Sequence, residues 1–502
     1  MDTSYLQANK KSIFIGLFLI FFIELIRTTW ITDDANITLT TALNFINGYG
    51  PNFNIDERVQ AYTHPLWFLL LSGVTFVIRN IYVATFLLCI GTSSLVFWLF
   101  VSKFSKNILN VTLVACAFIL SKSYIDFATS GLENPLSHLL IIFLVLSAIK
   151  ATKEKTQIYL LNYFLCYSCL FLCREDLILL LFPITLWVII CNIKTPTILA
   201  RSILIGILPA LIWTIFSLYY YGFLFPNTAY AKLGNGIPID ERISQGFIYL
   251  IDAVNRDPLI LFMIFFGTYA GLRNGIFNAL LSIGIILYLM YIVYIGGDFM
   301  AGRFLTAPFL LAGIQLARAN LNKPQLLMLA LSIGILGAMS IHTTLLSDSS
   351  YKNRKISNNG IADERGYYFQ KWGLLNETRA GLLPPPYSST LGEKPQIACA
   401  FIGAMALNKG PGRHYLDKCA LTDPLLSHLP AKKDAKWRIG HFARALPENY
   451  TQSLFLNKNL LTDPLLYNYY NSIRKITRGN LNDPSRWREI IRLNFQTSGP
   501  YS

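Results

Sequence analysis

Long apolar runs fill the first 345 residues of the chain. Hydrophobic residues make up 53% of the sequence and charged residues only 14%, whereas about a quarter of a soluble protein is charged. A helix that crosses a hydrocarbon core of about 30 Å needs roughly 20 apolar residues. The sequence therefore predicts an α-helical polytopic membrane protein rather than a globular enzyme with one large core.

Eleven apolar segments are interpreted as transmembrane helices. They are 12–31, 81–101, 108–121, 135–149, 157–173, 177–193, 198–220, 258–272, 275–296, 304–319 and 323–345. The segment 66–78 would reach only about 20 Å as a helix and is interpreted as a helix in the membrane interface. No small-residue cleavage site follows the first segment, so it is interpreted as an uncleaved anchor. Its Glu24 and Arg27 are three residues apart and can pair on one helix face.

The positive charges of the short loops predict the orientation. With eleven spans and a cytoplasmic N-terminus, the basic loops Lys103–Lys106, Lys150–Lys155, Lys194, Arg273 and Arg318–Lys323 all lie on the cytoplasmic side, as the positive-inside rule requires. The polar loops then lie on the outer side, including the first outer loop, 32–80. The sequence thus predicts a transmembrane module, 1–346, and an extracytoplasmic soluble domain, 347–502.

The predicted soluble domain is basic. From Asp348 to Ser502 there are 22 Lys and Arg residues against 12 Asp and Glu, which favours contact with anionic lipids or phosphate-bearing substrates. No nucleic-acid motif accompanies the charge, so nucleic acid is not an expected partner. Short apolar runs such as Ile397–Ala404 could be strands, which predicts an α/β-like domain.

Two further features of this domain concern its local structure. Cys399 and Cys419 could form a disulfide outside the cytoplasm, and the sequence leaves this open. Leu-Thr-Asp-Pro-Leu-Leu occurs at 421–426 and again at 461–466. Both copies read as helix starts, with Asp as the cap and Pro in the first turn.

Asp33 and Asp34 directly follow the first predicted span. Adjacent carboxylates at such a place cost desolvation unless they have a use. One use is a general base that removes the proton of an attacking hydroxyl; the alternative is a solvated pair at a helix end. Asp34 could also contribute to a Mg²⁺, Mn²⁺ or Ca²⁺ site, because such ions take carboxylate oxygens. No Walker loop, zinc motif or nucleotide fingerprint is present, and no cofactor is certain.

Short motifs follow in order along the chain. The first outer loop carries Asp33-Asp34, Leu43-Asn44-Phe45, Gly48-Tyr49-Gly50, Asn54, Glu57-Arg58-Val59, Tyr62-Thr63 and Pro65-Leu66-Trp67. Then come Ser130-Gly131-Leu132-Glu133, Arg174-Glu175-Asp176, Tyr221-Gly222, Phe225-Pro226-Asn227-Thr228, Tyr230-Ala231-Lys232, Gly296-Gly297-Asp298-Phe299-Met300 and Gly302-Arg303-Phe304. The last are Gly403-Ala404-Met405, Leu421-Thr422-Asp423-Pro424, Arg438-Ile439-Gly440-His441-Phe442, Pro447 and Tyr450. Together they resemble a GT-C glycosyltransferase family whose best-known member is the mycobacterial terminal β-(1→2)-arabinofuranosyltransferase.

The resemblance implies a many-helix membrane fold in the bacterial inner membrane, with an active site on its outer, periplasmic face. It implies a polyprenyl-phosphate sugar donor and a surface glycan or glycolipid acceptor. Asp33 looks like the general base, supported by Asp34. Arg303, Lys232 and Arg174 would bind the donor phosphate, because arginine suits bidentate phosphate contact. Sugar or acceptor contacts are expected from Glu133, Asp298, His64, Asn227, Tyr62 and His441.

The chain departs from the family pattern at several places. Ala61 and His64 flank Tyr62-Thr63, Arg174-Glu175-Asp176 stands where the family tends to have Arg-Pro-Glu, and Asn134-Pro135 follows Glu133. These differences put the family's sugar and acceptor in doubt, so arabinofuranose and other pentoses or hexoses stay open. Two rival functions share many of the same features. One is a transporter or flippase for lipid-linked sugars, and the other is a non-catalytic glycan-binding membrane protein.

Overall fold

The computed structural model describes residues 9–104, 107–154, 156–233, 236–353, 355–376, 394–432, 437–496 and 499–500. The chain divides into two compact units, each assembled from segments that are separate in sequence. The first unit comprises Met1–Thr32, Phe86–Pro209 and Ile239–Gly381, and the second comprises Asp33–Thr85, Ala210–Pro238 and Leu382–Ser502. The predicted domain boundary after residue 346 concerns where the chain leaves the membrane, and it stays a prediction.

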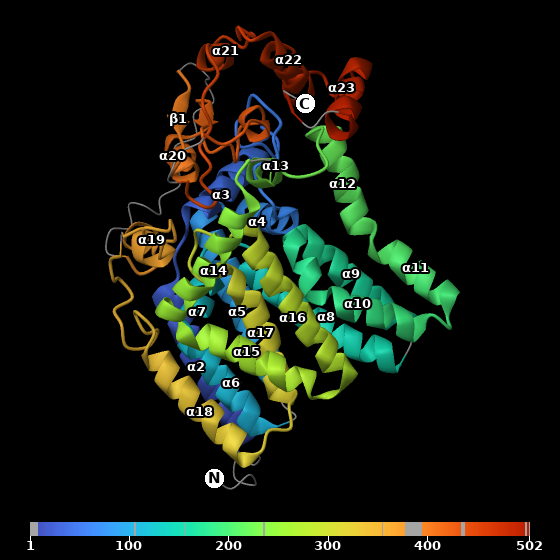
Figure 1. Cartoon of the computed structure of the whole chain (residues 1–502), viewed down its shortest axis with the longest axis vertical. Coiled ribbons are helices and arrows are strands. Elements are labelled where there is room, and N and C mark those ends of the chain that lie inside the picture. Colours follow the sequence, from blue (N-terminus) through green and yellow to red (C-terminus); the bar gives the residue numbers. More distant parts are fainter. Residues whose placement is uncertain are drawn as a thin grey trace. The chain divides into compact units, whose positions relative to one another are not determined.

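The first unit is built of helices (Figure 1). In chain order they are α2 (Lys10–Thr28), most of α5 (Ile81–Lys103), α6 (Ile108–Leu120), α7 (Lys122–Ala128), α8 (Asn134–Lys153), α9 (Gln157–Cys173), η1 (Glu175–Leu177), α10 (Ile178–Asn192), α11 (Pro196–Gly206), α14 (Ile239–Arg256), α15 (Pro258–Leu272), α16 (Gly275–Ile295), η2 (Arg303–Leu305), α17 (Thr306–Arg318), α18 (Lys323–Ala338) and α19 (Glu364–Trp372). The predicted pair is confirmed within α2, where Arg27 Nη2 lies 2.9 Å from Glu24 Oε1.

Small residues allow close helix packing in this unit. A Cβ atom on Gly284 of α16 would lie 2.0 Å from the carbonyl oxygen of Leu180 in α10. A Cβ atom on Gly246 of α14 would lie 2.3 Å from the carbonyl oxygen of Val293 in α16. Helices in lipid associate largely through such close van der Waals packing, because lipid tails are as apolar as the side chains themselves. The helices thus pack as expected for a membrane protein.

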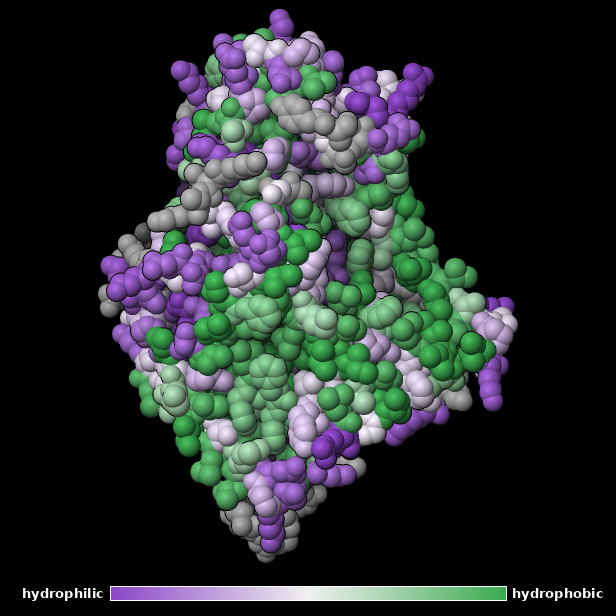
Figure 2. Space-filling view, viewed as in Figure 1, coloured by the Kyte–Doolittle hydropathy of each residue, from purple (hydrophilic) through white to green (hydrophobic). Residues whose placement is uncertain are grey.

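All eleven predicted transmembrane segments contain helix, which is compatible with the predicted class of helical membrane protein. Among the described residues, five helices or helix pairs are long and apolar enough to span a bilayer: Ile81–Lys103, Asn134–Lys153, Glu175–Asn192, Pro196–Tyr220 and Gly275–Ile295. The number rises to seven if two bent helix pairs are each one span. Figure 2 shows hydrophobic residues covering much of the visible faces of the helices, and hydrophilic residues gathered over α21–α23. The count of eleven spans stays a prediction, because several of the predicted helices are shorter than 18 residues.

The second unit combines helices from the first predicted outer loop with the C-terminal segment. In chain order its elements are α3 (Asp33–Ile46), α4 (Pro65–Ile78), most of α12 (Leu208–Tyr220), α13 (Asn227–Leu233), β1 (Gln396–Ala398), α20 (Ile402–Lys409), β2 (Tyr415–Asp417), η4 (Leu426–His428), α21 (Tyr450–Phe455), α22 (Pro464–Arg478) and α23 (Pro484–Phe495). Their apolar residues form a common core that includes Ile37 of α3, Ile402 of α20 and Ile473 of α22.

The repeated Leu-Thr-Asp-Pro motifs both begin helical turns, as predicted. Asp463 accepts hydrogen bonds from the backbone N–H groups of Leu465 and Leu466 at the start of α22. Asp423 accepts equivalent bonds from Leu425 and Leu426, although only the short η4 follows it. Side-chain oxygens at these positions satisfy backbone donors that have no partner inside the helix.

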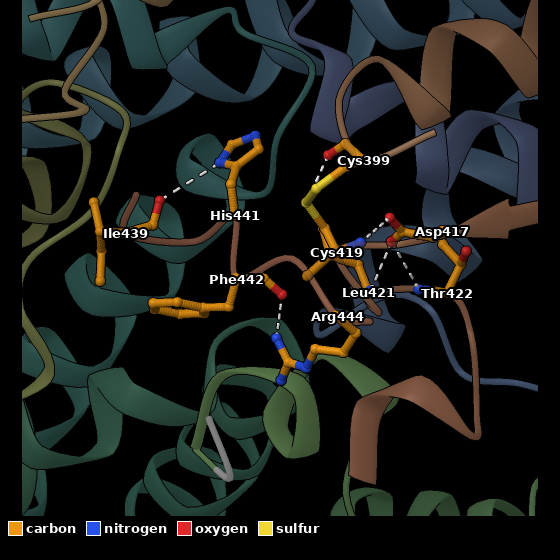
Figure 3. Close-up of a disulfide and its surroundings, with 9 residues drawn as sticks. All are labelled: Cys399, Asp417, Cys419, Leu421, Thr422, Ile439, His441, Phe442 and Arg444. Carbon is orange, nitrogen blue, oxygen red and sulfur yellow. Dashed lines mark hydrogen bonds between the residues drawn. A yellow bond between two sulfur atoms is a disulfide. The ribbon is translucent and has the colours of Figure 1, made fainter. Parts of the chain in front are cut away.

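The two described strands, β1 and β2, pair in parallel. β1 covers only the beginning of the apolar run Ile397–Ala404 that predicted a strand, because α20 starts at Ile402. Cys399 and Cys419 form a disulfide that joins the chain just after β1 to the chain just after β2 (Figure 3). The sequence left this bond open, and the structure contains it.

Removal of the disulfide should lower the stability of the second unit. The bond closes a loop with a sequence separation of 20 residues, and for a loop of that size we expect about 3 kcal/mol of stabilisation. The double substitution Cys399→Ser with Cys419→Ser should therefore lower the thermal unfolding midpoint of the purified protein under oxidising conditions. Under reducing conditions the wild type and the double variant should unfold alike, and a difference that persists there would contradict the prediction.

Candidate functional site

Asp33 is the first residue of α3 and lies at the N-terminal end of α20. The backbone N–H of Ala404 donates a hydrogen bond of 2.8 Å to Asp33 Oδ1. Gly403 makes the contact close, since a Cβ atom there would lie 2.3 Å from the carbonyl oxygen of Asp33 and 2.8 Å from the nitrogen of Ile37. The two motifs Asp33-Asp34 and Gly403-Ala404-Met405 are thus in direct contact, although 370 residues separate them.

Burial makes the Asp33 carboxyl a weak acid. Its side chain is 8% exposed, and desolvation raises its pKa to about 7, opposed by the hydrogen bond from Ala404 and assisted by repulsion from Asp34 and Asp417. Asp34 is more exposed than Asp33. A carboxyl that is half ionised near pH 7 can both take up and release a proton. The geometry therefore favours Asp33 over Asp34 as the base.

Asp417, at the end of β2, adds a second buried carboxyl to this region (Figure 3). It accepts hydrogen bonds from the backbone N–H groups of Cys419 and Leu421, at 2.8 and 2.7 Å. Burial raises its pKa to about 7, and these hydrogen bonds together with Arg444 act in the opposite direction. Through these hydrogen bonds Asp417 fixes the backbone conformation of the segment that contains Cys419, next to the disulfide. Sequence reasoning missed it because no motif marks a lone aspartate after a short strand.

His64 and two polar residues of α3 lie along the same part of the second unit. Thr38 Oγ1 lies 2.8 Å from His64 Nε2, so the two side chains are joined by a hydrogen bond. Asn36 and Thr40 are 0% and 6% exposed. Among the described residues, neither the Asn36 amide nor the Thr40 hydroxyl has a hydrogen-bond partner. Buried polar groups of this kind usually have a partner, so Asn36 and Thr40 are additional candidates for substrate contact that sequence reasoning missed.

Two residues predicted to bind sugar or acceptor, Tyr62 and Asn227, make contacts inside the second unit. The Tyr62 hydroxyl lies 2.9 Å from that of Tyr221, and its ring stacks on Phe68. The Asn227 amide donates to the carbonyl oxygen of Ala420 at 2.9 Å and accepts from Ser427 at 3.0 Å. These contacts hold both side chains within the second unit, and their binding of sugar or acceptor stays a prediction.

Lys232 and His441 form part of a basic region of the second unit. Lys232 ends α13 and is exposed. Burial lowers the pKa of His441 to about 3, and the charges of Arg438 and Lys232 contribute in the same direction. His441 is therefore neutral at physiological pH and cannot act as an acid there. The structure thus places the predicted phosphate-binding lysine close to His441.

Four of the predicted residues form one cluster in the first unit. Arg303 Nη2 donates to Glu133 Oε1 at 2.9 Å, and Arg303 Nη1 lies 3.6 Å from Asp298 Oδ2. Arg174 Nε lies 3.7 Å from the same oxygen of Glu133. All four residues are at most 9% exposed. The four side chains are thus in direct contact, which no spacing in the sequence could specify, and their binding of a substrate stays a prediction.

The loops that carry this cluster depend on glycine. Gly296, Gly297 and Gly302 have φ angles of 90°, 73° and 75°, which non-glycine residues rarely adopt. A Cβ atom on Gly297 would also lie 2.5 Å from the Tyr249 ring. These glycines allow the chain to turn sharply on both sides of Asp298 and to present Arg303 to Glu133.

Two further residues complete the arginine cluster. Asp176 accepts a hydrogen bond of 3.1 Å from Arg174 Nε, and the Tyr288 hydroxyl accepts one of 3.1 Å from Arg174 Nη2. The motif Arg174-Glu175-Asp176 could have indicated the role of Asp176, but Tyr288 lies in an apolar segment without a motif. Among the described residues, no group of three or more His, Cys, Asp or Glu side chains is arranged to hold a metal ion. Metal binding by Asp34 stays a prediction.

Substitution of Gly403 should destabilise the second unit. Gly403→Ala would place a methyl group 2.3 Å from the carbonyl oxygen of Asp33, and overpacking of this kind typically costs about 1–3 kcal/mol. Gly73→Ala is a matched control in the same unit, because its Cβ atom would have no neighbour within 4 Å. We expect Gly403→Ala to lower the thermal unfolding midpoint and Gly73→Ala to leave it unchanged or slightly higher. Equal midpoints for the two variants would contradict the close contact of α20 with α3.

Comparisons with known proteins support the resemblance seen in the motifs. No protein-family model matches the chain. The chain is 27% identical over 526 aligned residues to the terminal beta-(1->2)-arabinofuranosyltransferase of Mycobacterium tuberculosis, covering 84% of this chain and 81% of that protein. It is 30% identical over 332 residues to the protein of the same name from Corynebacterium glutamicum, covering 56% of this chain and 46% of that protein. The predicted similarity to these enzymes is thereby confirmed.

Proposed function

We propose that the chain is a membrane glycosyltransferase that moves a sugar from a polyprenyl-phosphate donor to a surface glycan or glycolipid. The main support is Asp33, which is buried against the start of α20 and has a pKa of about 7. The chain that contains it is similar to two arabinofuranosyltransferases. Glycosyl transfer to a hydroxyl needs a base of this strength, because the acceptor loses its proton as it attacks.

In the proposed reaction, the Asp33 carboxylate takes the proton of an acceptor hydroxyl. The acceptor oxygen forms a bond to the anomeric carbon of the sugar while the bond from that carbon to the phosphate oxygen breaks. The electron pair leaves with the polyprenyl phosphate. Attack opposite to the leaving group inverts the anomeric centre. Asp34 supports Asp33, either through its charge or by binding a divalent cation.

Arg303, Arg174 and Lys232 are proposed to bind the donor phosphate. Guanidinium groups recognise phosphate oxygens through paired N–H donors. The contacts of Glu133 with both arginines hold the guanidinium groups in a fixed geometry, so that they need little rearrangement as negative charge develops on the leaving group. Asp298 orients Arg303 from the other side. Lys232 supplies an exposed positive charge in the second unit.

The sugar is proposed from the names of the relatives, and the residues that contact it are proposed from buried polar groups of the described chain. The names of the relatives make arabinofuranose the first sugar to test, and the departures at Ala61, His64 and Glu175 are the reason to test other pentoses and hexoses as well. Asn36, Thr40 and His64 are proposed to contact sugar hydroxyls. Tyr62, Asn227 and His441 stay proposed contacts of the sugar or the acceptor.

The proposed location is the bacterial inner membrane, with the active site and residues 347–502 on the periplasmic side. The disulfide between Cys399 and Cys419 supports that side, because structural disulfides persist in oxidising compartments and are rare in the cytosol.

The proposal is tested by a transfer assay with the purified full-length protein in nanodiscs. Donors are polyprenyl-phosphate arabinose and, in parallel, other polyprenyl-phosphate pentoses and hexoses, with an envelope glycan extract as acceptor. Release of polyprenyl phosphate together with labelled acceptor supports the proposal. Movement of the donor across sealed vesicles without any labelled product would instead favour a flippase and contradict the enzyme assignment.

The transfer rate should depend on pH through Asp33. The base acts in its ionised form, and burial raises its pKa to about 7. We therefore expect kcat/KM to rise about tenfold per pH unit well below 7 and to level off above it. The free energy of unfolding should fall as the pH rises through this range, because Asp33 in the folded state holds its proton between its ordinary pKa of 3.8 and about 7, whereas the unfolded state has lost it. A flat pH–rate profile between pH 5 and 8 would contradict the assignment of Asp33.

A further inference from the structure

Helix α23 has an apolar face that is exposed in the structure. Trp487, Ile491 and Phe495 follow one another at intervals of four residues and thus share one helix face. Their side chains are 37%, 51% and 68% exposed. The opposite face is buried through Arg486, Ile490 and Leu493, so the exposed face is a distinct second surface of a well-anchored helix.

α23 is fixed to the end of a helix that is apolar enough to span a membrane. Arg486 Nη1 and Nη2 donate to the carbonyl oxygens of Tyr219 and Tyr220 at 2.8 and 3.0 Å, the last residues of α12 (Figure 1). Asn494 Nδ2 donates to the carbonyl oxygen of Gly222 at 2.8 Å. These bonds cap the C-terminal end of α12 with a cation, which also suits the negative end of a helix dipole.

The exposed face of α23 continues the exposed face of α12. On α12, Leu211, Ile212, Ile215 and Tyr219 are 48%, 63%, 58% and 38% exposed. The segment Pro196–Tyr220 is only 22% buried, the lowest share among the five candidate spans. The ring of Tyr219 lies 6.3 Å from that of Trp487. Tyrosine and tryptophan at the end of a span are typical of the boundary between lipid and water.

The charges beside this face favour lipid headgroups. Arg488 and Arg492 flank the apolar stripe on α23, and Arg492 also pairs with Glu489 of the same helix, with Nη2 2.7 Å from Oε2. Basic side chains at this depth can extend toward phosphates while their stems cover apolar surface. Near an anionic leaflet such residues add attraction to the burial of the apolar face.

We propose that α23 lies in the membrane interface beside the end of α12, with Trp487, Ile491 and Phe495 among the acyl chains and Arg488 and Arg492 at anionic headgroups. The C-terminal segment is then held on the bilayer surface instead of standing free in the aqueous phase. This proposal rests on the apolar character of α12 and does not depend on the proposed glycosyl transfer.

The test uses the full-length protein in nanodiscs of phosphatidylcholine brominated near the top of the acyl chains, which quenches nearby tryptophan fluorescence. Trp487→Phe should remove part of the quenched emission. Trp437→Phe is the control, since Trp437 lies in the loop before Phe442 and packs on that ring; it should remove emission that the lipid does not quench. If Trp487→Phe leaves the quenched component intact, Trp487 faces water or a protein partner, and the proposal is wrong.

A second experiment tests the proposed contact of the α23 arginines with anionic headgroups. Hydrogen exchange of the α23 backbone should slow further when phosphatidylglycerol is mixed into the phosphatidylcholine nanodiscs. Arg488→Gln should abolish this additional protection and should leave the protection in pure phosphatidylcholine unchanged. Protection that is identical with and without phosphatidylglycerol in the wild type would overturn the headgroup part of the proposal.

Discussion

Asp33→Asn should lower the rate of sugar transfer by about 10²- to 10⁴-fold, the range that a general base typically contributes. The asparagine has the same shape as aspartate and still accepts the hydrogen bond that Ala404 donates at 2.8 Å in the wild type. It also removes a carboxyl whose ionisation burial disfavours. The variant should therefore fold at least as well as the wild type. Single-turnover transfer, together with a donor-binding measurement, separates lost chemistry from lost binding.

Asp34→Asn is the matched control for this variant. The two aspartates are adjacent, but Asp34 is more exposed and Asp33 accepts the bond from α20. We expect Asp34→Asn to reduce the rate much less than Asp33→Asn and to keep the rise of the rate through pH 7. If Asp34→Asn abolishes transfer while Asp33→Asn does not, the two roles are exchanged. If both variants keep the wild-type rate, neither residue is the base.

The sequence predicted the helices of this chain better than it predicted which residues contact one another in the folded structure. All eleven apolar segments contain helix, because the length and composition of a run are local properties. Arg174, Glu133, Asp298 and Arg303 were each singled out, but their common contacts depend on loops whose turns are set by Gly297 and Gly302. These turns set the directions in which the side chains point, and the hydrophobic periodicity of the sequence carries no information about those directions.

The contacts of Asp33 show even more clearly that the sequence does not reveal which distant segments touch. Asp33-Asp34 was visible in the sequence, and Gly403-Ala404-Met405 was visible as a motif, yet nothing in either indicated that they touch. The close packing of α20 on α3 is a contact of very long sequence separation. Asn227 shows a contact that its motif did not indicate: its amide donates to the backbone carbonyl oxygens of Ala420 and Asp423.

Buried charges were missed for a related reason. Lys122, Asp126, Asp363 and Arg365 form a buried network in the first unit, in which Lys122 Nζ lies 3.1 Å from Asp363 Oδ1 and Arg365 Nε lies 3.1 Å from Asp126 Oδ1. The residues Asp363 and Arg365 belong to the segment predicted to be the soluble domain. Charges from distant segments neutralise one another here, and only the folded chain shows which ones meet.

Arg303→Gln should have the second large effect, on both activity and stability. The substitution removes the guanidinium 2.9 Å from Glu133 Oε1 and leaves a buried carboxylate with weaker compensation. Loss of one partner of a buried ion pair costs about 3–5 kcal/mol. If Arg303 also binds the donor phosphate, its charged hydrogen bonds are worth about 1.5–3 kcal/mol each, so transfer should fall by one to two orders of magnitude beyond any loss of folded protein. Arg256→Gln is the control, because it breaks the more exposed pair of Arg256 with Asp252 in the same unit.

A double substitution separates the two roles of Arg303. In Arg303→Gln with Glu133→Gln, the buried carboxylate that lacked compensation is gone, and the thermal unfolding midpoint should return toward that of the wild type. Transfer should stay low, because no guanidinium is present to stabilise the charge that develops on the leaving phosphate. Arg303→Lys should restore the charge without the paired N–H geometry and should recover activity only in part. If the double variant regains both stability and transfer, Arg303 serves only to neutralise Glu133, and donor binding must be assigned to other cations.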